Sequence, residues 1–167
     1  FGKYYQNSTE PIINDIFVFF NSNNVEMVIE SYFLNVLKEK KIIEKDYITF
    51  SSHSELDSSF DMLVSIGGDG TILRAATLVR DSGVPILGIN AGRLGFLATV
   101  QKDNISEFLQ LIIDKKYSIS KRTLLSLTSS PENESIQELN FALNEISVSR
   151  KETTSMITVE TYLNGEF

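Results

Sequence analysis

Apolar positions in the first 116 residues alternate between continuous runs, which predict strands, and helical spacing. The runs Met62 to Ile66 and Pro85 to Ile89 each lead into a glycine-bearing segment, which is typical of strands buried on both faces of a parallel sheet. Val25 to Ile29 predicts a shorter strand, and the polar stretch Ser51 to Ser59 predicts a loop. We expect four helices. The first is capped by Ser8 or Thr9 and has Ile12, Ile16, Phe19 and Phe20 on one face, and the last begins at Asp103 or Asn104. The two between them cover Tyr32 to Lys38 and Thr71 to Arg80.

From Tyr117 onward the apolar period changes to two, which is typical of strands with one buried face. Polar residues from Ser129 to Gln137 predict a loop. The pattern therefore predicts an α/β unit with a doubly wound parallel sheet over residues 1–116, followed over 117–167 by the first strands of an antiparallel, all-β domain. Three alternating segments carry the second prediction: Leu125 and Leu127; Leu139, Phe141 and Leu143; and Ile157, Val159, Thr161 and Leu163.

The pair Asn164-Gly165 is a strong two-residue hairpin signal at the end of the last alternating segment. Only Glu166 and Phe167 follow it, so the return strand of that hairpin is missing. We therefore expect this chain to be a piece of a longer protein, with an incomplete second domain.

Composition removes several classes of function. The chain has no cysteine and one histidine, His53, so disulfide frameworks, thiolate metal sites and structural zinc are excluded, and a metal ion would have to bind oxygen. A formal net charge of -7 gives no basic field for nucleic acid. Polar residues interrupt the apolar stretches, so we expect no membrane span and a cytoplasmic protein.

The segment from Ser65 to Thr71 joins a predicted buried strand to a predicted helix and contains Gly67, Gly68 and Gly70 around Asp69. In open α/β folds this carboxyl edge of the sheet is where ligands bind, and a helix start offers free N–H groups to phosphates. Asp69 has two interpretations at this stage. It either caps the following helix, or it ligates a cation or accepts a proton from a substrate hydroxyl.

This loop matches neither common nucleotide-binding fingerprint. It lacks the Gly-Lys-Ser/Thr ending of a P-loop, and Leu73 stands where the dinucleotide fingerprint has its last glycine. The sequence therefore argues against a P-loop NTPase and against an ordinary dehydrogenase.

Two further stretches are candidates for the same site. Residues from Gly88 to Leu97 leave the next predicted strand on the same side, and Phe96 there could pack on a flat ring or belong to the core. The pair Asn144-Glu145 interrupts apolar strand positions, either as a bulge or as a donor and acceptor for a diol. Arg74, one turn into the predicted helix, could reach a phosphate or only solvate its face.

Taken together, these stretches resemble the NAD kinases along the whole chain and in the same order. Gly67-Gly68-Asp69-Gly70-Thr71 is similar to that family's glycine-rich signature, and Asn90 to Leu97 is similar to its second block. Asn144-Glu145 is similar to its Asn-Glu pair. Lipid kinases of the diacylglycerol type and phosphofructokinases share a relative of the first signature, and the other two blocks separate the NAD kinases from them.

The resemblance implies a Rossmann-like domain followed by an all-β domain, and phosphoryl transfer from ATP, or from polyphosphate in some members, to the 2′-hydroxyl of the adenosine ribose of NAD. It implies that Asp69 is the catalytic proton acceptor, with Gly70 beside it. It also implies NAD contacts from Asn144 and Glu145. The further binding residues that it implies are Arg74, Phe96 and Ser155.

The resemblance further implies a divalent cation, Mg²⁺, on the donor phosphates, and a homodimer or homotetramer when the protein is intact. We assign no residue as a metal ligand. The family's second long glycine- and threonine-rich segment would lie beyond Phe167, so we expect the 167-residue chain alone to have little or no activity. The alternatives are a lipid kinase that shares the glycine-rich loop and a nucleotide-binding fragment without catalysis.

Overall fold

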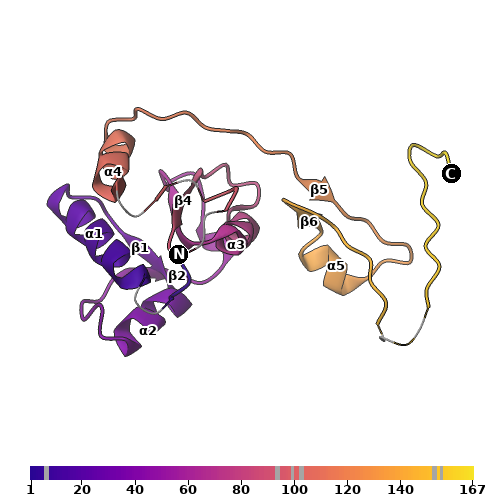
Figure 1. Ribbon diagram of the computed structural model, residues 1–167, viewed down its shortest axis with the longest axis horizontal. Helices are drawn as coiled ribbons and strands as arrows, with labels where there is room; N and C mark the ends of the chain where they lie inside the picture. Colours follow the sequence, from indigo (N-terminus) through magenta and orange to yellow (C-terminus); the bar gives the residue numbers. More distant parts are fainter. Residues whose placement is uncertain (6–7, 93–94, 99, 102–103, 152–153, 155) are drawn as a thin grey trace. The chain divides into compact units, whose positions relative to one another are not determined.

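The computed structural model describes residues 1–5, 8–92, 95–98, 100–101, 104–151, 154 and 156–167. The chain divides into two compact units, Phe1–Arg122 and Thr123–Phe167, and each is described by itself (Figure 1). The first unit contains alternating helices and strands, and the second contains two short strands and a short helix. The chain is therefore a mixed α/β protein, as expected.

The first unit matches most of the elements that the pattern predicts. Its helices are α1 (Thr9–Ser22), α2 (Ser31–Glu39), α3 (Asp69–Val79) and α4 (Ile105–Ile113), with a 3-10 helix, η1 (His53–Glu55), in the segment expected to be a loop. Its strands are β1 (Val28–Glu30), β2 (Ile48–Phe50), β3 (Leu63–Gly67) and β4 (Ile86–Asn90). Helix α3 begins two residues before Thr71, and β1 lies nearer the start of α2 than the apolar run indicates.

Strands β3 and β4 pair in parallel, with Leu63 opposite Ile86 and Gly67 opposite Asn90. Gly2 bridges Ile66 in parallel on one side of this pair, and Val100 bridges Ile89 in parallel on the other. Because parallel strands end at the same edge, the segments that follow Gly67 and Asn90 begin side by side.

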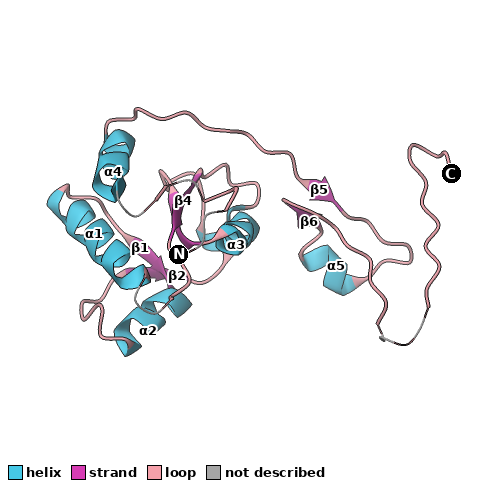
Figure 2. Cartoon of the chain, viewed as in Figure 1, coloured by secondary structure: helices cyan, strands magenta, loops and turns pink. Residues whose placement is uncertain are grey.

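Helices cover both faces of the β3–β4 pair (Figure 2). One apolar cluster packs α1, α2 and α4 against Ile66 and Ile89. The other packs Ala75 and Val79 of α3 with Leu63. Since successive side chains of a strand point to opposite faces, burial on both faces explains why β3 and β4 read as continuous apolar runs.

Strand β2 was not predicted, although it pairs in parallel with β1 from Val28 opposite Ile48 to Glu30 opposite Phe50. It has three residues, of which only Phe50 is buried. A strand this short and exposed leaves no periodic signal in the sequence.

The second unit differs from the prediction in two of its segments. Strands β5 (Leu125–Ser126) and β6 (Phe141–Ala142) pair antiparallel as expected, but the predicted polar loop contains part of the short helix α5 (Glu134–Glu138). The third alternating segment, from Ile157 to Leu163, forms no strand beyond a single bridge from Leu163 to Glu166. None of the described residues of this unit is buried, so the alternation there has no core to face.

The hairpin turn itself is present at Asn164-Gly165. Leu163 and Glu166 exchange two backbone hydrogen bonds, with N···O distances of 2.8 and 3.0 Å. The φ angles of Asn164 and Gly165 are 54° and 87°, and two positive values are what this tight hairpin turn requires.

Close packing of α3 on the sheet predicts that Gly88→Ala destabilises the protein. A Cβ on Gly88 would lie 2.3 Å from Cδ1 of Ile72 and 3.0 Å from Cα of Ala98, so the buried Ile72 side chain and the backbone at Ala98 would have to shift. We expect the free energy of unfolding, measured with urea on the intact protein, to fall by about 1–3 kcal/mol. Gly92→Ala is the matched control because a Cβ there meets no atom within 4 Å, and equal stability of the two variants would contradict the prediction.

Candidate functional site

The loop between β3 and α3 is a tight connection in which Gly68 is the N-cap and Asp69 the first helical residue. A Cβ on Gly67 would lie 2.2 Å from Oγ1 and 2.8 Å from Cβ of Thr71, a side chain that is itself buried. Thr71 donates its backbone N–H to the carbonyl of Gly68 at 2.9 Å, which closes the first turn. Glycine is therefore needed at position 67 for the helix to start this close to the end of the strand.

The half-buried carboxylate of Asp69 accepts hydrogen bonds from three consecutive backbone N–H groups of the loop after β4. Phe96 donates to Oδ2 at 2.7 Å, and Leu97 and Ala98 donate to Oδ1 at 2.9 and 3.1 Å. These bonds stabilise the ionised carboxylate, so the backbone N–H of Phe96 first, then those of Leu97 and Ala98, hold the pKa of Asp69 below its ordinary value of 3.8.

The interpretation of Asp69 as the cap of its own helix is wrong. No side-chain capping bond is present at the start of α3, and the carboxylate is turned toward residues 96–98 instead. Its negative charge still lies in the first turn of α3, where the helix dipole favours it. Asp69 thus joins two loops that follow neighbouring strands.

The segment after β4 also contacts the first loop through its backbone. Ala91 donates its N–H to the carbonyl of Gly67 at 3.2 Å, and the side chain of Asn90 accepts from the N–H of Gly92 at 2.8 Å. Arg93 and Leu94 lie outside the described residues. The structure therefore places the two glycine-bearing segments in direct contact.

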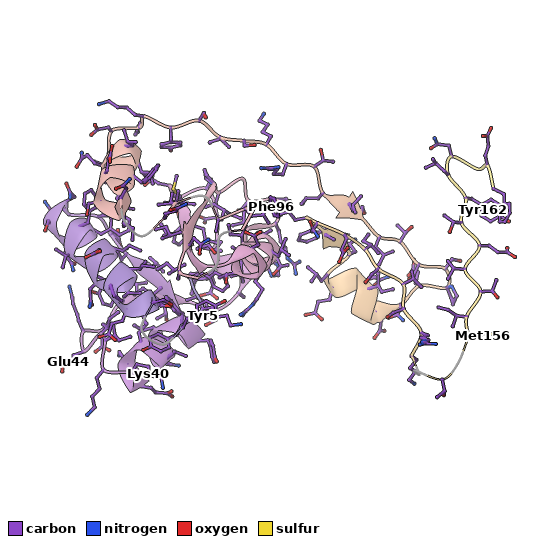
Figure 3. All side chains as sticks on the ribbon, in the orientation of Figure 1. Tyr5, Lys40, Glu44, Phe96, Met156 and Tyr162 are labelled. Carbon is purple, nitrogen blue, oxygen red and sulfur yellow. The ribbon has the colours of Figure 1, made fainter. Side chains whose placement is uncertain are left out.

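Three other sequence-predicted residues of the first unit are exposed near this loop. Gly70 is exposed, and a Cβ there would meet no atom within 4 Å. Phe96 is 94% exposed and belongs to no apolar cluster, so its expected alternative role as a core residue is wrong (Figure 3). Arg74 is exposed, and its guanidinium carbon lies 5.4 Å from the centroid of the Phe1 ring.

The remaining predicted residues belong to the second unit. Asn144 and Glu145 are exposed and lie just after β6, since Asn144 is the second residue beyond the end of that strand. Ser155 lies outside the described residues. Within the first unit, the structure thus brings together Asp69 and the backbone N–H groups of residues 96–98.

Sequence reasoning missed the donors to Asp69 because they are backbone N–H groups, which any residue type supplies. One signal was present in Gly95, where an added Cβ would lie 2.2 Å from Oδ1 of Asp69. A cavity of about 670 Å³ exists elsewhere in the first unit, around Val28 and Leu63, and no described residue from 67 to 70 or from 88 to 98 lines it. The cavity is therefore separate from the candidate site.

Two other features are absent from the described residues. No group of three or more His, Asp or Glu side chains gathers there in a way that could hold a metal ion. Within the same residues, no helix has the length and apolar character needed to cross a lipid bilayer.

Comparison with known proteins matches this chain to one family. The family model described as "ATP-NAD kinase N-terminal domain" matches residues 4–117. The NAD kinase of Flavobacterium johnsoniae is 71% identical over 167 residues, and that of Flavobacterium psychrophilum is 66% identical over the same length. Each match covers 100% of this chain and 57% of the relative, so the chain spans little more than half of these proteins.

A solved structure shares the fold. It is the crystal structure of yeast NADH kinase complexed with NADH, which superposes with a TM-score of 0.64 at 20% sequence identity. The match covers 80% of this chain and 42% of the yeast chain. At this identity the likeness establishes the fold and nothing more.

The hydrogen bonds to Asp69 predict a titration below the ordinary range. Because the folded pKa is lowered, the stability that Asp69 contributes is complete above pH 3.8 and is lost as the pH falls from there through the folded pKa. We expect the ¹³C signal of the Asp69 carboxyl, assigned by its loss in Asp69→Asn, to show its inflection below pH 3.8 in the folded protein. The same signal in the urea-unfolded chain is the control, and identical inflections would show that the three N–H groups do not hold the carboxylate.

Proposed function

The chain belongs to the NAD kinase family, and we propose that the intact protein transfers the γ-phosphoryl group of ATP to the 2′-hydroxyl of the adenosine ribose of NAD, giving NADP. The observation that carries this proposal is the Asp69 carboxylate, held at the carboxyl end of β3 between two glycine-bearing segments. The related proteins are named NAD kinases, which favours NAD over the lipid substrates of kinases that share the glycine-rich loop.

In the proposed reaction, Asp69 accepts the proton of the ribose hydroxyl. The 2′-oxygen forms a bond to the γ-phosphorus, the bond from that phosphorus to the oxygen bridging the β-phosphate breaks, and ADP leaves. The lowered pKa keeps Asp69 ionised at neutral pH, so its carboxylate is in the form that can accept a proton. Phosphoryl transfer makes little demand on base strength, because its transition state is loose and positioning dominates.

Residues around Asp69 would leave room for the dinucleotide. The open space at Gly70 allows a ribose to approach the start of α3. The exposed ring of Phe96 offers a flat apolar surface for a base, and Arg74 offers a positive charge for a phosphate. Membership of the NAD kinase family and the names of the related proteins support a nicotinamide dinucleotide as the ligand class.

The second unit would supply the remaining contacts. We assign the polar edges of the adenosine to Asn144 and Glu145, whose exposed side chains leave their donors and acceptors available, and a further contact to Ser155. A ligand-bound structure of the intact protein tests this assignment directly.

The residues that the structure describes do not form a protein metal site of their own. Asp69 is the only acid of its loop and already accepts three N–H groups, and the described residues hold no cluster of acids. We therefore assign no step to a protein-bound ion. Phosphoryl transfer generally needs Mg²⁺, which would arrive bound to the phosphates of ATP. The ion would keep several of its own water ligands.

We propose a Rossmann-like doubly wound domain over 1–116 and the start of an all-β domain over 117–167. Parallel pairing of β1 with β2 and of β3 with β4, with helices on both faces of the second pair, supports the first part. The division into compact units at Arg122 supports a boundary in this region. A cytoplasmic homodimer or homotetramer completes the proposal.

The substitution Asp69→Asn in the intact protein tests the catalytic role. The amide oxygen can still accept from Leu97 and Ala98, so two of the three loop contacts survive, whereas the NH2 group cannot accept from Phe96 and the proton acceptor is lost. We expect turnover of NAD to fall by about 10²–10⁴-fold, with a much smaller change in NAD affinity. Turnover, NAD binding by calorimetry and circular dichroism are measured on the same sample.

Glu107→Gln is the matched control, since it removes one exposed carboxylate from α4, in the same unit and outside the site. A folded Asp69→Asn protein that loses less than about tenfold in turnover would remove Asp69 from the mechanism. Phosphorylation of diacylglycerol instead of NAD by the unsubstituted protein would overturn the proposed function itself.

A further inference from the structure

The backbone of Gly95 lies against the Asp69 carboxylate more closely than any residue with a side chain could. A Cβ at position 95 would stand 2.2 Å from Oδ1, 2.4 Å from Cγ and 2.5 Å from Oδ2 of Asp69. Real Cβ atoms essentially never approach other atoms this closely, so something must shift if one is added. The three hydrogen bonds on the carboxylate come from residues 96–98, directly after Gly95, so either the loop moves or the carboxylate turns away from its donors, and the contact is disrupted in both cases.

The three donors occupy the two carboxylate oxygens unequally. Oδ1 accepts from Leu97 and Ala98, whereas Oδ2 accepts only from Phe96 among the described residues. An ionised carboxylate has about two acceptor positions on each oxygen. Oδ2 therefore keeps one acceptor position for a ligand, next to the N–H of Phe96.

We propose that Gly95 is a positioning residue, whose missing side chain lets the 96–98 backbone hold Asp69 so that Oδ2 accepts the substrate hydroxyl. The proposal rests on the proposed function and adds to it a residue that does not touch the substrate. Gly95 acts through Asp69 alone, because its own contribution is the space that the carboxylate fills. The proton of the ribose hydroxyl passes to Oδ2 in the phosphoryl transfer described above.

Gly95→Ala in the intact protein tests this role. The added methyl group separates the loop from Asp69, so the three N–H bonds weaken and the carboxylate loses its orientation. We expect kcat to fall by about 10–100-fold, the size of effect that a displacement near 1 Å produces, while KM for NAD changes by less than about threefold. We also expect the pKa of Asp69, followed by ¹³C NMR, to rise toward 3.8.

Gly92→Ala controls for a methyl group added to the same loop, because its Cβ meets open space and the pKa of Asp69 should not move. A double-mutant cycle then separates positioning from general damage. If Gly95 acts through Asp69, adding Gly95→Ala to Asp69→Asn should lower kcat by less than about threefold. An equal loss of kcat in both backgrounds would overturn the proposal.

A measurement on the unsubstituted protein keeps the proposal testable even where the variant fails to fold. The amide ¹H and ¹⁵N shifts of Phe96, Leu97 and Ala98 should follow one titration, that of Asp69, and this pH dependence should vanish in Asp69→Asn. Amide shifts that ignore the Asp69 titration would overturn the proposal. Absence of NAD phosphorylation by the unsubstituted protein is a different result, which overturns the proposed function while the amide titration still reports the contact.

Discussion

The carboxylate of Asp69 lies where two loops from neighbouring parallel strands meet, and three backbone N–H groups converge on it. The register of β3 and β4 brings both loops to the same edge of the sheet. Gly67 has no side chain to clash with Thr71 at the start of α3. Gly95 has none to clash with the carboxylate of Asp69. The geometry of the candidate site is thus a consequence of strand pairing, of two close approaches and of the charge-assisted hydrogen bonds to the half-buried carboxylate.

Elements with strong local patterns were predictable from the sequence. The apolar runs that became β3 and β4 are buried on both faces, and the predicted face of α1 includes the buried Ile12 and Ile16. β2 escaped prediction because three mostly exposed residues carry no period. The alternating segment from Ile157 to Leu163 was predicted as a strand and is not one, because alternation produces a strand only where one face is buried.

The candidate site was predictable in its residue types but not in its contacts. Glycines around an acid after a buried strand pointed to Asp69 and to the edge of the sheet where it lies. The partners of its carboxylate are main-chain groups from 27 to 29 residues further on, and their identity leaves no trace in composition or spacing. Phe96 was ambiguous because an aromatic side chain packs equally well in a core and on the flat ring of a ligand.

Burial is concentrated early in the chain, since every buried apolar residue of the described part lies at or before Leu109. During synthesis the amino-terminal residues leave the ribosome seconds before the last ones, and domains generally fold as units in that order. The first unit contains its own core and both partners of the Asp69 contact, so it can condense, and the two loops can meet, while residues of the second unit are still being added. Asp69 and its three N–H donors would then be in place before Asn144 and Glu145 have been synthesised.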